Sequence, residues 1–167
     1  MLPDPLLDPR ALRAALASFS TGCAIVTSTT GEGRHLAVRV TSFSSVSLDP
    51  PLVLWSLHRE SPSLEGFQHA GRFTINLLAL DQRHLSHRFN AAESDELTDV
   101  QHDPGPLGCP RLRASLAVTD CSTYSTTELG DHVLFVGEVH AALCREAPPL
   151  TFFGGALGTF RMGDPQT

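Results

Sequence analysis

The chain has 167 residues, of which 41% are hydrophobic and 18% are charged, and its formal net charge is −6 at pH 7. This composition is ordinary for one globular domain, and the 12 basic residues, all arginines, are scattered along the chain. A scattered basic set argues against a nucleic-acid partner, which requires a clustered basic face.

The cysteines and the N-terminal residues indicate in which cellular compartment the protein is expected. The four cysteines form no CxxC pair, so we expect no structural metal site. The first residues, MLPDPLLDPR, lack the charge and apolar run of a signal peptide. No apolar stretch approaches the ~20 residues of a membrane span. We therefore expect no membrane association and a reducing, cytoplasmic setting.

The first third of the chain predicts a helix followed by a β-hairpin. Asp8 before Pro9 indicates a helix start, and apolar residues at helical spacing extend the helix over Ala11–Ser20. Two strands are predicted at Cys23–Ser28 and Arg34–Thr41, joined by a glycine-rich turn.

The next stretch, residues 37–51, is rich in hydroxyl side chains and stops at a double proline. Its sequence is AVRVTSFSSVSLDPP, with hydroxyls at Thr41, Ser42, Ser44, Ser45 and Ser47. A buried strand would not tolerate these hydroxyls without polar partners. We interpret the stretch as a strand that runs into a loop wrapping a polar ligand.

The remaining pattern completes a mainly β fold. The predicted elements are a strand at Pro51–Leu57, a helix from Ser61 to about Gln68, a strand at Arg72–Ala79, a helix from Asp81 to about Phe89, an irregular excursion at Ala91–Cys109, and long strands at Leu112–Ser122 and His132–Leu143. Hairpin-like connections without βαβ alternation predict an antiparallel β-barrel with short helices. We expect a single domain over 1–167, with flexible tails at 1–10 and 161–167.

Three kinds of site deserve comparison. Serine nucleophile chemistry is disfavoured because no G-x-S-x-G elbow is present. His84 and His87 lie at helical i, i+3 spacing, but a solvated helix surface explains them better than a metal does. A flavin site fits better, because strand-edge amides and hydroxyls can bond the ring while Phe43 or Trp55 supplies an apolar wall.

The phosphate of such a flavin needs its own partners. The segment after the Pro51–Leu57 strand offers an arginine and two hydroxyls, at Arg59, Ser61 and Ser63. A plain helix cap with an exposed arginine explains the same residues equally well, so the alternatives stay open here.

Five segments, in order, resemble one known family. They are ALASFSTGCAIVTS, TSFSSVSLDPPLVLWSL, GRFTINLLALDQRHLSHRF, GDHVLFVGEVHAA and LTFFGG. Together they resemble the flavin reductase family, the small flavin-binding split-barrel proteins, from about Leu12 to Phe160.

The resemblance implies a homodimeric split barrel that binds FMN or FAD and reduces it with NADH or NADPH. In that family's pattern Thr41 and Ser42 face the isoalloxazine ring, and Ser44 and Ser45 contact the ring edge or the ribityl chain. The other implied positions are Arg59, Ser61 and Ser63 at the phosphate, the backbone of Asn76, Leu77 and Leu78 against the ring, and His132 near the nicotinamide. No metal is implied.

Three positions depart from the family pattern. Arg39 stands where relatives usually have a small residue, and it could crowd the pocket, point outward or add an anion contact. Ala156 and Leu157 replace an arginine and an aromatic, and Asp95–Leu97 lacks a basic residue.

The leading hypothesis is the reductase of a two-component monooxygenase, with a separate oxygenase partner. The alternatives are an enzyme that retains its flavin and acts on its own substrate, and a non-catalytic flavin-binding protein.

Overall fold

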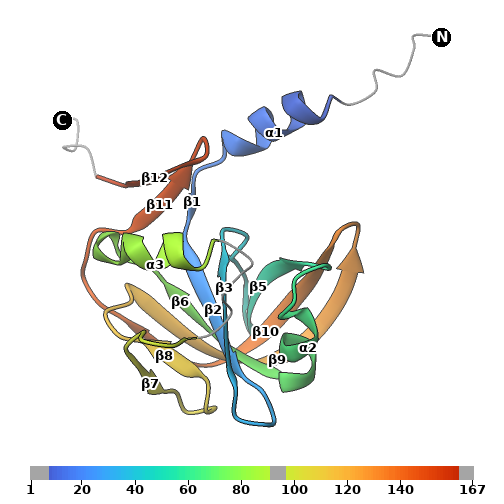
Figure 1. Cartoon of the computed structure of the whole chain (residues 1–167), viewed down its shortest axis with the longest axis vertical. Coiled ribbons are helices and arrows are strands. Elements are labelled where there is room, and N and C mark those ends of the chain that lie inside the picture. Colours follow the sequence, from blue (N-terminus) through green and yellow to red (C-terminus); the bar gives the residue numbers. More distant parts are fainter. Residues whose placement is uncertain (1–7, 91–96, 162–167) are drawn as a thin grey trace.

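The computed structural model describes residues 8–90 and 97–161. Within these ranges the chain is mainly β, with a few short helices (Figure 1). The antiparallel, mainly β architecture predicted from the sequence is confirmed. No helix in the described ranges is long and apolar enough to cross a membrane. Segments 1–7 and 162–167, most of the predicted tails, lie outside the described residues.

The main sheet has seven strands in the order β3-β2-β6-β9-β10-β5-β4, and all neighbours are antiparallel. The strands are β2 (Ala24–Thr29), β3 (His35–Val40), β4 (Ser44–Leu48), β5 (Pro51–His58), β6 (Arg72–Leu77), β9 (Ala117–Leu129) and β10 (His132–Cys144). The predicted first hairpin is β2–β3. The two long C-terminal strands are β9 and β10, although β9 begins at Ala117 rather than at Leu112.

The hydroxyl-rich stretch contains more regular structure than the strand and loop that we predicted. Ser44–Leu48 forms β4, an edge strand paired with β5, and Asp49–Pro50 makes the turn between them. A β-bulge interrupts the pairing between Ser45 and Ser47. Most of β4 is exposed, so its hydroxyls can bond to water, and their contact with a ligand stays a prediction.

Two small sheets flank the main one. One contains β1 (Thr21–Gly22), β11 (Leu150–Phe153) and β12 (Ala156–Thr159), and the other pairs β7 (His102–Pro104) with β8 (Pro110–Leu112). The hairpin of β7 and β8 lies largely in the segment predicted to be irregular. The sequence did not predict it, because these short strands carry no apolar alternation and form through pairing with each other. Residues 91–96 of that excursion lie outside the described residues.

The helices are α1 (Pro9–Ala17), α2 (Leu64–Ala70), the 3-10 turn η1 (Leu80–Gln82) and α3 (Arg83–Arg88). The predicted start of α1 is confirmed, since the Asp8 carboxylate accepts a hydrogen bond from the Arg10 amide at 3.0 Å. Ser61 is not the start of the second helix, whose N-cap is Ser63, and Asp81 lies inside η1 rather than capping it.

Helix α1 stands clear of the sheets and buries none of its residues (Figure 1). Its predicted apolar face is open, with Leu16 66% exposed and Phe19 77% exposed. The end of α1 is tied to the β11–β12 turn by a hydrogen bond from the Gly154 amide to the Ala17 carbonyl, 3.0 Å long. The described residues of this one chain therefore leave the apolar face of α1 uncovered.

The core has two parts on opposite faces of the sheet. In the first, Trp55 stacks on Phe135 with ring centroids 4.4 Å apart, and Phe67 and Phe73 meet its edges. Gly137 is required there, because a Cβ would come within 2.4 Å of Phe73. The second part lies against α3 and contains Cys23, Ile25, Ala37, Leu78, Leu85, Phe89, Leu97, Leu112 and Leu150.

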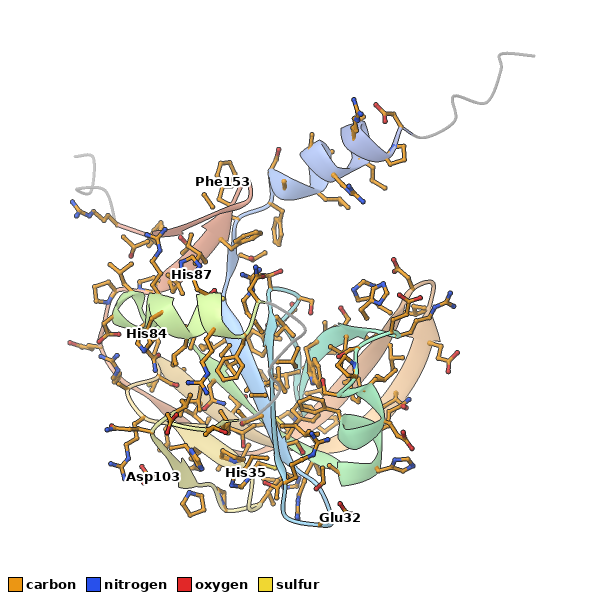
Figure 2. The ribbon with its side chains drawn as sticks, viewed as in Figure 1. Glu32, His35, His84, His87, Asp103 and Phe153 are labelled. Carbon is orange, nitrogen blue, oxygen red and sulfur yellow. The ribbon has the colours of Figure 1, made fainter. Side chains whose placement is uncertain are left out.

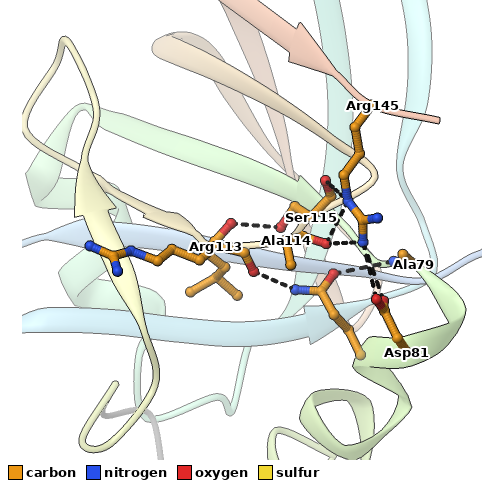
Figure 3. Close-up of polar contacts among 8 residues, drawn as sticks. Ala79, Asp81, Arg113, Ala114, Ser115 and Arg145 are labelled. Atoms are coloured by element: carbon orange, nitrogen blue, oxygen red, sulfur yellow. Dashed lines mark hydrogen bonds and ion pairs between the residues drawn. The ribbon is translucent and has the colours of Figure 1, made fainter. Parts of the chain in front are cut away.

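A polar network fixes the turn that leads into β9 (Figure 3). Arg145 donates to the carbonyls of Ala114 and Ser115 and forms an ion pair with Asp81 at 3.3 Å. Gln82 donates to the Arg113 carbonyl at 2.8 Å. These contacts hold Ala114 at φ 62°, a conformation that a residue with a side chain adopts at a cost. The network is a structural clamp.

Candidate functional site

A polar pocket of about 250 Å³ opens where the end of β3, the end of β5 and the start of β10 meet. It is lined by Arg39, Val40, Thr41, Ser42, Ser56, Leu57, His58 and His132. The antiparallel register of β5 and β10 places His58 directly opposite His132. Three of the predicted site residues, Thr41, Ser42 and His132, are thereby brought together.

Larger cavities exist, and several of their charged groups are paired with one another. Cavities of about 350 and 290 Å³ share Arg113, which is paired with Asp103 at 2.6 Å. Arg145 lines the smaller of the two and pairs with Asp81. A third, of about 360 Å³, is lined in part by Leu97 and Thr98, which border the segment outside the described residues. The β3–β5–β10 pocket is the one of these cavities that the predicted residues Thr41, Ser42 and His132 line.

Two residues of the hydroxyl-rich stretch, Thr41 and Ser42, line this pocket, and they differ in their hydrogen bonds. The Ser42 hydroxyl accepts a hydrogen bond from the Ser56 amide at 2.9 Å and donates to the Ser56 carbonyl at 3.3 Å. Thr41 is half-buried beside it and has no side-chain hydrogen bond within the described residues. Ser42 is thus engaged in joining the segment after β3 to β5, while Thr41 has its bonding capacity free.

The other members of the stretch do not line the pocket. Phe43 packs against the first part of the core. Ser44 and Ser45 are exposed on β4, where the Ser44 hydroxyl donates to the Ser45 carbonyl at 3.2 Å.

His132 is held by its neighbour Asp131. The Nδ1 atom of His132 lies 2.7 Å from Asp131 Oδ1, and since a carboxylate only accepts, Nδ1 carries the proton. This hydrogen bond, together with the charge of the ring, holds the pKa of Asp131 below its usual range. The Nε2 atom of a neutral His132 is left as an acceptor.

His58 is a pocket residue that sequence reasoning missed. Its Nδ1 accepts from the Glu60 amide at 3.2 Å, so a neutral ring carries its proton on Nε2, which lies 4.0 Å from Asp131 Oδ2. The rings of His58 and His132 meet edge to face with centroids 5.2 Å apart. Only the cross-strand register could have revealed this pairing.

The predicted phosphate segment follows β5 directly. The Arg59 amide donates to the Asp131 carbonyl at 2.9 Å, which ties this segment to the start of β10. Ser61 and Ser63 share a hydrogen bond of 3.0 Å, and Ser63 is fully buried. Arg59 is exposed and adjoins the pocket through His58.

Asn76, Leu77 and Leu78 are not among the residues that line the pocket. The side-chain amide of Asn76 is buried and donates hydrogen bonds to the Ile25 carbonyl and to Thr27 Oγ1, each at 3.1 Å. The Leu78 amide donates to the Cys23 carbonyl at 2.9 Å, and the Leu77 carbonyl accepts from the Leu116 amide at 2.8 Å. Ring contact by this backbone stays a prediction.

Arg39 points toward the small sheet. Its guanidinium carbon lies 5.4 Å from the centroid of the Phe152 ring on β11, within the range of a cation–π contact. Arg39 therefore contacts the small sheet and also lines the pocket.

Residues 8–90 and 97–161 contain no group of three His, Cys, Asp or Glu side chains placed to hold a metal ion. His84 and His87 are both exposed on α3 (Figure 2).

Comparison with known proteins gives consistent matches. A family model described as "Flavin reductase like domain" matches residues 16–161. The FMN reductase (NADH) SmoA of Agrobacterium fabrum is 43% identical over 153 residues, which cover 92% of this chain and 87% of that protein. HsaB of Rhodococcus jostii, the reductase subunit of a flavin-dependent monooxygenase, is 37% identical over 150 residues, covering 89% and 76%.

A solved structure shows the same fold. It is the NADH:FAD oxidoreductase SgcE6 of Streptomyces globisporus C-1027 in complex with NAD and FAD fragments. It superposes with a TM-score of 0.87 at 28% identity, covering 96% of this chain and 99% of that one.

Proposed function

The chain belongs to the flavin reductase family, and we propose that it transfers hydride from NADH or NADPH to FMN or FAD and supplies the reduced flavin to a partner monooxygenase. The match over residues 16–161 carries this assignment. The chain is therefore an NAD(P)H:flavin oxidoreductase, and the polar pocket of β3, β5 and β10 is its proposed site.

The pocket residues fit a flavin. Thr41 offers an uncommitted hydroxyl for a ring oxygen or nitrogen, and Val40 and Leu57 add apolar surface beside it. Arg59 and Ser61 lie at the exposed end of the site and provide the charge and hydroxyl that a phosphate requires. No metal is needed for hydride transfer between a nicotinamide and a flavin.

The protein contributes binding and orientation rather than proton transfer. The flavin and nicotinamide supply the redox chemistry, and the chain must hold the two rings in contact and keep water out. Asp131 fixes the proton of His132 on Nδ1, which leaves Nε2 able to accept a hydrogen bond from the nicotinamide carboxamide. His58 supports the His132 ring from the neighbouring strand.

The main sheet curls into a split barrel in this proposal. The hydrogen bonds between Ser42 and Ser56 support it, because they join the end of β3 to β5 although these strands are not neighbours in the sheet. Figure 1 shows β3 beside β5 as this requires. The 167 residues then form one flavin reductase-like domain.

The active form is proposed to be a homodimer. A pocket of about 250 Å³ is smaller than the roughly 300–1,000 Å³ of ligand sites, so one chain receives only part of a nucleotide. The open apolar face of α1 is suited to cover a second copy. A cytoplasmic setting is supported by the four cysteines, all of which are free thiols.

The direct test is an assay of NADH or NADPH oxidation by the purified protein with added FMN or FAD. We expect steady oxidation of the nicotinamide whose rate rises with the concentration of free flavin. A protein that binds flavin but whose flavin neither NADH nor NADPH reduces would contradict the proposal and favour a retained prosthetic flavin or a non-catalytic role.

Replacing Arg59 tests the phosphate position. Arg59→Ala should weaken FMN binding by about 1.5–3 kcal/mol, as expected for loss of a charge-assisted hydrogen bond. Arg83→Ala, which removes an exposed arginine on α3, is the matched control and should leave the dissociation constant unchanged. Equal affinity of the Arg59 variant and the wild type would place the phosphate elsewhere.

A further inference from the structure

Arg39 and Thr41 lie close together at the end of β3. Arg39 belongs to the strand, which ends at Val40, and Thr41 forms the bend that follows it. Both residues line the pocket of β3, β5 and β10. A flavin ring that occupied this pocket would therefore adjoin both residues.

No acid among residues 8–90 and 97–161 forms an ion pair with Arg39. In the described part of the chain the arginine ion pairs belong to Arg111, Arg113 and Arg145, and Arg39 forms none. Its side chain instead rests on the Phe152 ring at 5.4 Å, which orients the guanidinium without cancelling its charge.

The other ionisable groups around Arg39 leave it as the permanent cation of the pocket. Cys23, whose pKa is raised by burial, stays a neutral thiol, and His58 and His132 carry charge only when protonated. Asp131 is behind His132 and hydrogen-bonded to it. An arginine remains charged at every pH at which the protein is folded.

The reaction changes the charge of the flavin ring. Hydride transfer breaks a C–H bond of the nicotinamide and adds two electrons and one proton to the flavin ring. The nicotinamide is oxidised and becomes more positive by one unit, and the ring is reduced and becomes more negative by one unit until it takes up a second proton. A fixed cation beside the ring therefore favours the reduced form over the oxidised form.

We propose that Arg39 makes this pocket bind reduced flavin more tightly than oxidised flavin, and so determines which redox form the enzyme retains. Phe152 is the positioning residue that holds the guanidinium at the pocket edge. The inference rests on the proposed function, because it requires that the pocket receives the flavin ring. Its consequence is that the reduced product is held until it is passed on, rather than released at once to react with oxygen.

The test compares the dissociation constants of oxidised FMN and of FMN reduced chemically under anaerobic conditions. Chemical reduction removes any need for the nicotinamide reaction, so binding is measured apart from turnover. The variants are Arg39→Gln, which keeps much of the side chain but loses the charge, and Arg39→Lys, which keeps the charge. Arg83→Ala is the control for loss of a distant positive charge.

We expect wild-type protein to bind reduced FMN about tenfold or more tightly than oxidised FMN. Arg39→Gln should abolish most of this preference, Arg39→Lys should keep most of it, and Phe152→Leu should reduce it partly. Arg83→Ala should leave it unchanged.

Two results would overturn the inference while leaving the proposed function intact. An equal loss of affinity for both redox forms would assign Arg39 to a phosphate or to packing, and an unchanged preference in Arg39→Gln would remove it from the ring. Failure of the wild type to bind any flavin would instead overturn both proposals.

Discussion

The molecule contains two polar regions that differ in how completely their groups are paired. Around Asp120 the groups are buried and saturated: Thr74 donates to one carboxylate oxygen at 2.8 Å, and Arg111 donates to the other through Nε at 2.9 Å. Around Thr41 the groups are half-buried, and several have bonding capacity to spare. A saturated region stabilises the fold, whereas an unsaturated one at an opening is suited to bind a ligand.

The same distinction separates residues that looked alike in the sequence. Asn76 was a candidate for flavin binding through its backbone, and that contact stays a prediction. Its side chain is fully buried, donates to Ile25 and Thr27, and accepts from the Leu112 amide at 2.8 Å. Thr41, from an equally polar stretch, has no such partners in the described ranges. The number of remaining hydrogen-bond positions, rather than residue type, distinguishes them.

Replacing Asp120 is expected to have the largest effect, on stability alone. Asp120→Asn removes a fully buried charge and leaves Arg111, which is 22% exposed, without its anion. Loss of one partner of a buried ion pair costs about 3–5 kcal/mol of unfolding free energy, and the partial exposure of Arg111 favours the lower end. Urea unfolding measures the loss, and the FMN affinity of the folded variant should match the wild type.

Asp103→Asn is the matched control for that prediction. Asp103 forms an equally direct pair with Arg113, but both side chains are more than half exposed, so water compensates for the lost contact. If the two substitutions destabilised the protein equally, burial would not be what makes the Asp120 region structural.

Thr41 and Ser42 allow the two kinds of polar group to be compared at adjacent positions. Ser42→Ala removes both hydrogen bonds to Ser56 and should lower the unfolding free energy by about 1 kcal/mol. Thr41→Val keeps the side-chain shape, should leave stability nearly unchanged, and should weaken flavin binding by roughly 0.5–1.5 kcal/mol.

Denaturant unfolding and flavin titration of both variants decide the comparison. We expect Ser42→Ala to lose more unfolding free energy than Thr41→Val, and Thr41→Val to lose more flavin affinity than Ser42→Ala. A larger affinity loss in Ser42→Ala would show that its hydroxyl leaves Ser56 to bind the ring, and that the unsaturated region extends beyond Thr41.

Much of the fold could be predicted because apolar patterning records burial directly. The run PLVLWSL predicted β5, and the segments on either side of the first glycine-rich turn predicted β2 and β3. β4 was missed because an exposed edge strand needs no apolar alternation, and its existence depends on pairing with β5. The start of α2 was misplaced because the Ser61 hydroxyl bonds to Ser63 instead of capping a helix.

The site was less accessible to sequence reasoning than the fold. Thr41, Ser42 and His132 lie in motifs that the chain shares with its family, so local patterns could select them. His58 enters the pocket only because β5 and β10 pair in one particular register. The orientation of Arg39 depends on Phe152, which a separate small sheet supplies. Such contacts between distant strands have no local signature.

The smallest predicted effect concerns His35, far from the pocket. The Thr29 hydroxyl donates to the Gly108 carbonyl at 3.0 Å, so His35 Nδ1 carries a proton and donates to Thr29. Burial lowers the pKa of His35, and the nearby His102 ring, 5.1 Å away, lowers it further. Figure 2 shows His35 at the end of the molecule opposite Phe153.

The sign of the resulting pH dependence follows from the direction of this shift. Because the pKa of His35 is lower in the folded state, the unfolded state takes up the proton first as the pH falls. Stability is therefore greatest above the ordinary histidine pKa of about 6.5, decreases as the pH falls below it, and levels off below the folded value. His35→Gln should flatten this decrease, as measured by urea unfolding between about pH 7.5 and 5, while His69→Gln, which replaces an exposed histidine on α2, should retain it.

Flavin affinity should be the same in His35→Gln and wild type at each pH, because His35 lies outside the pocket. A change in flavin affinity without a change in the stability profile would place His35 with the unsaturated, ligand-binding groups and remove the separation between the two regions.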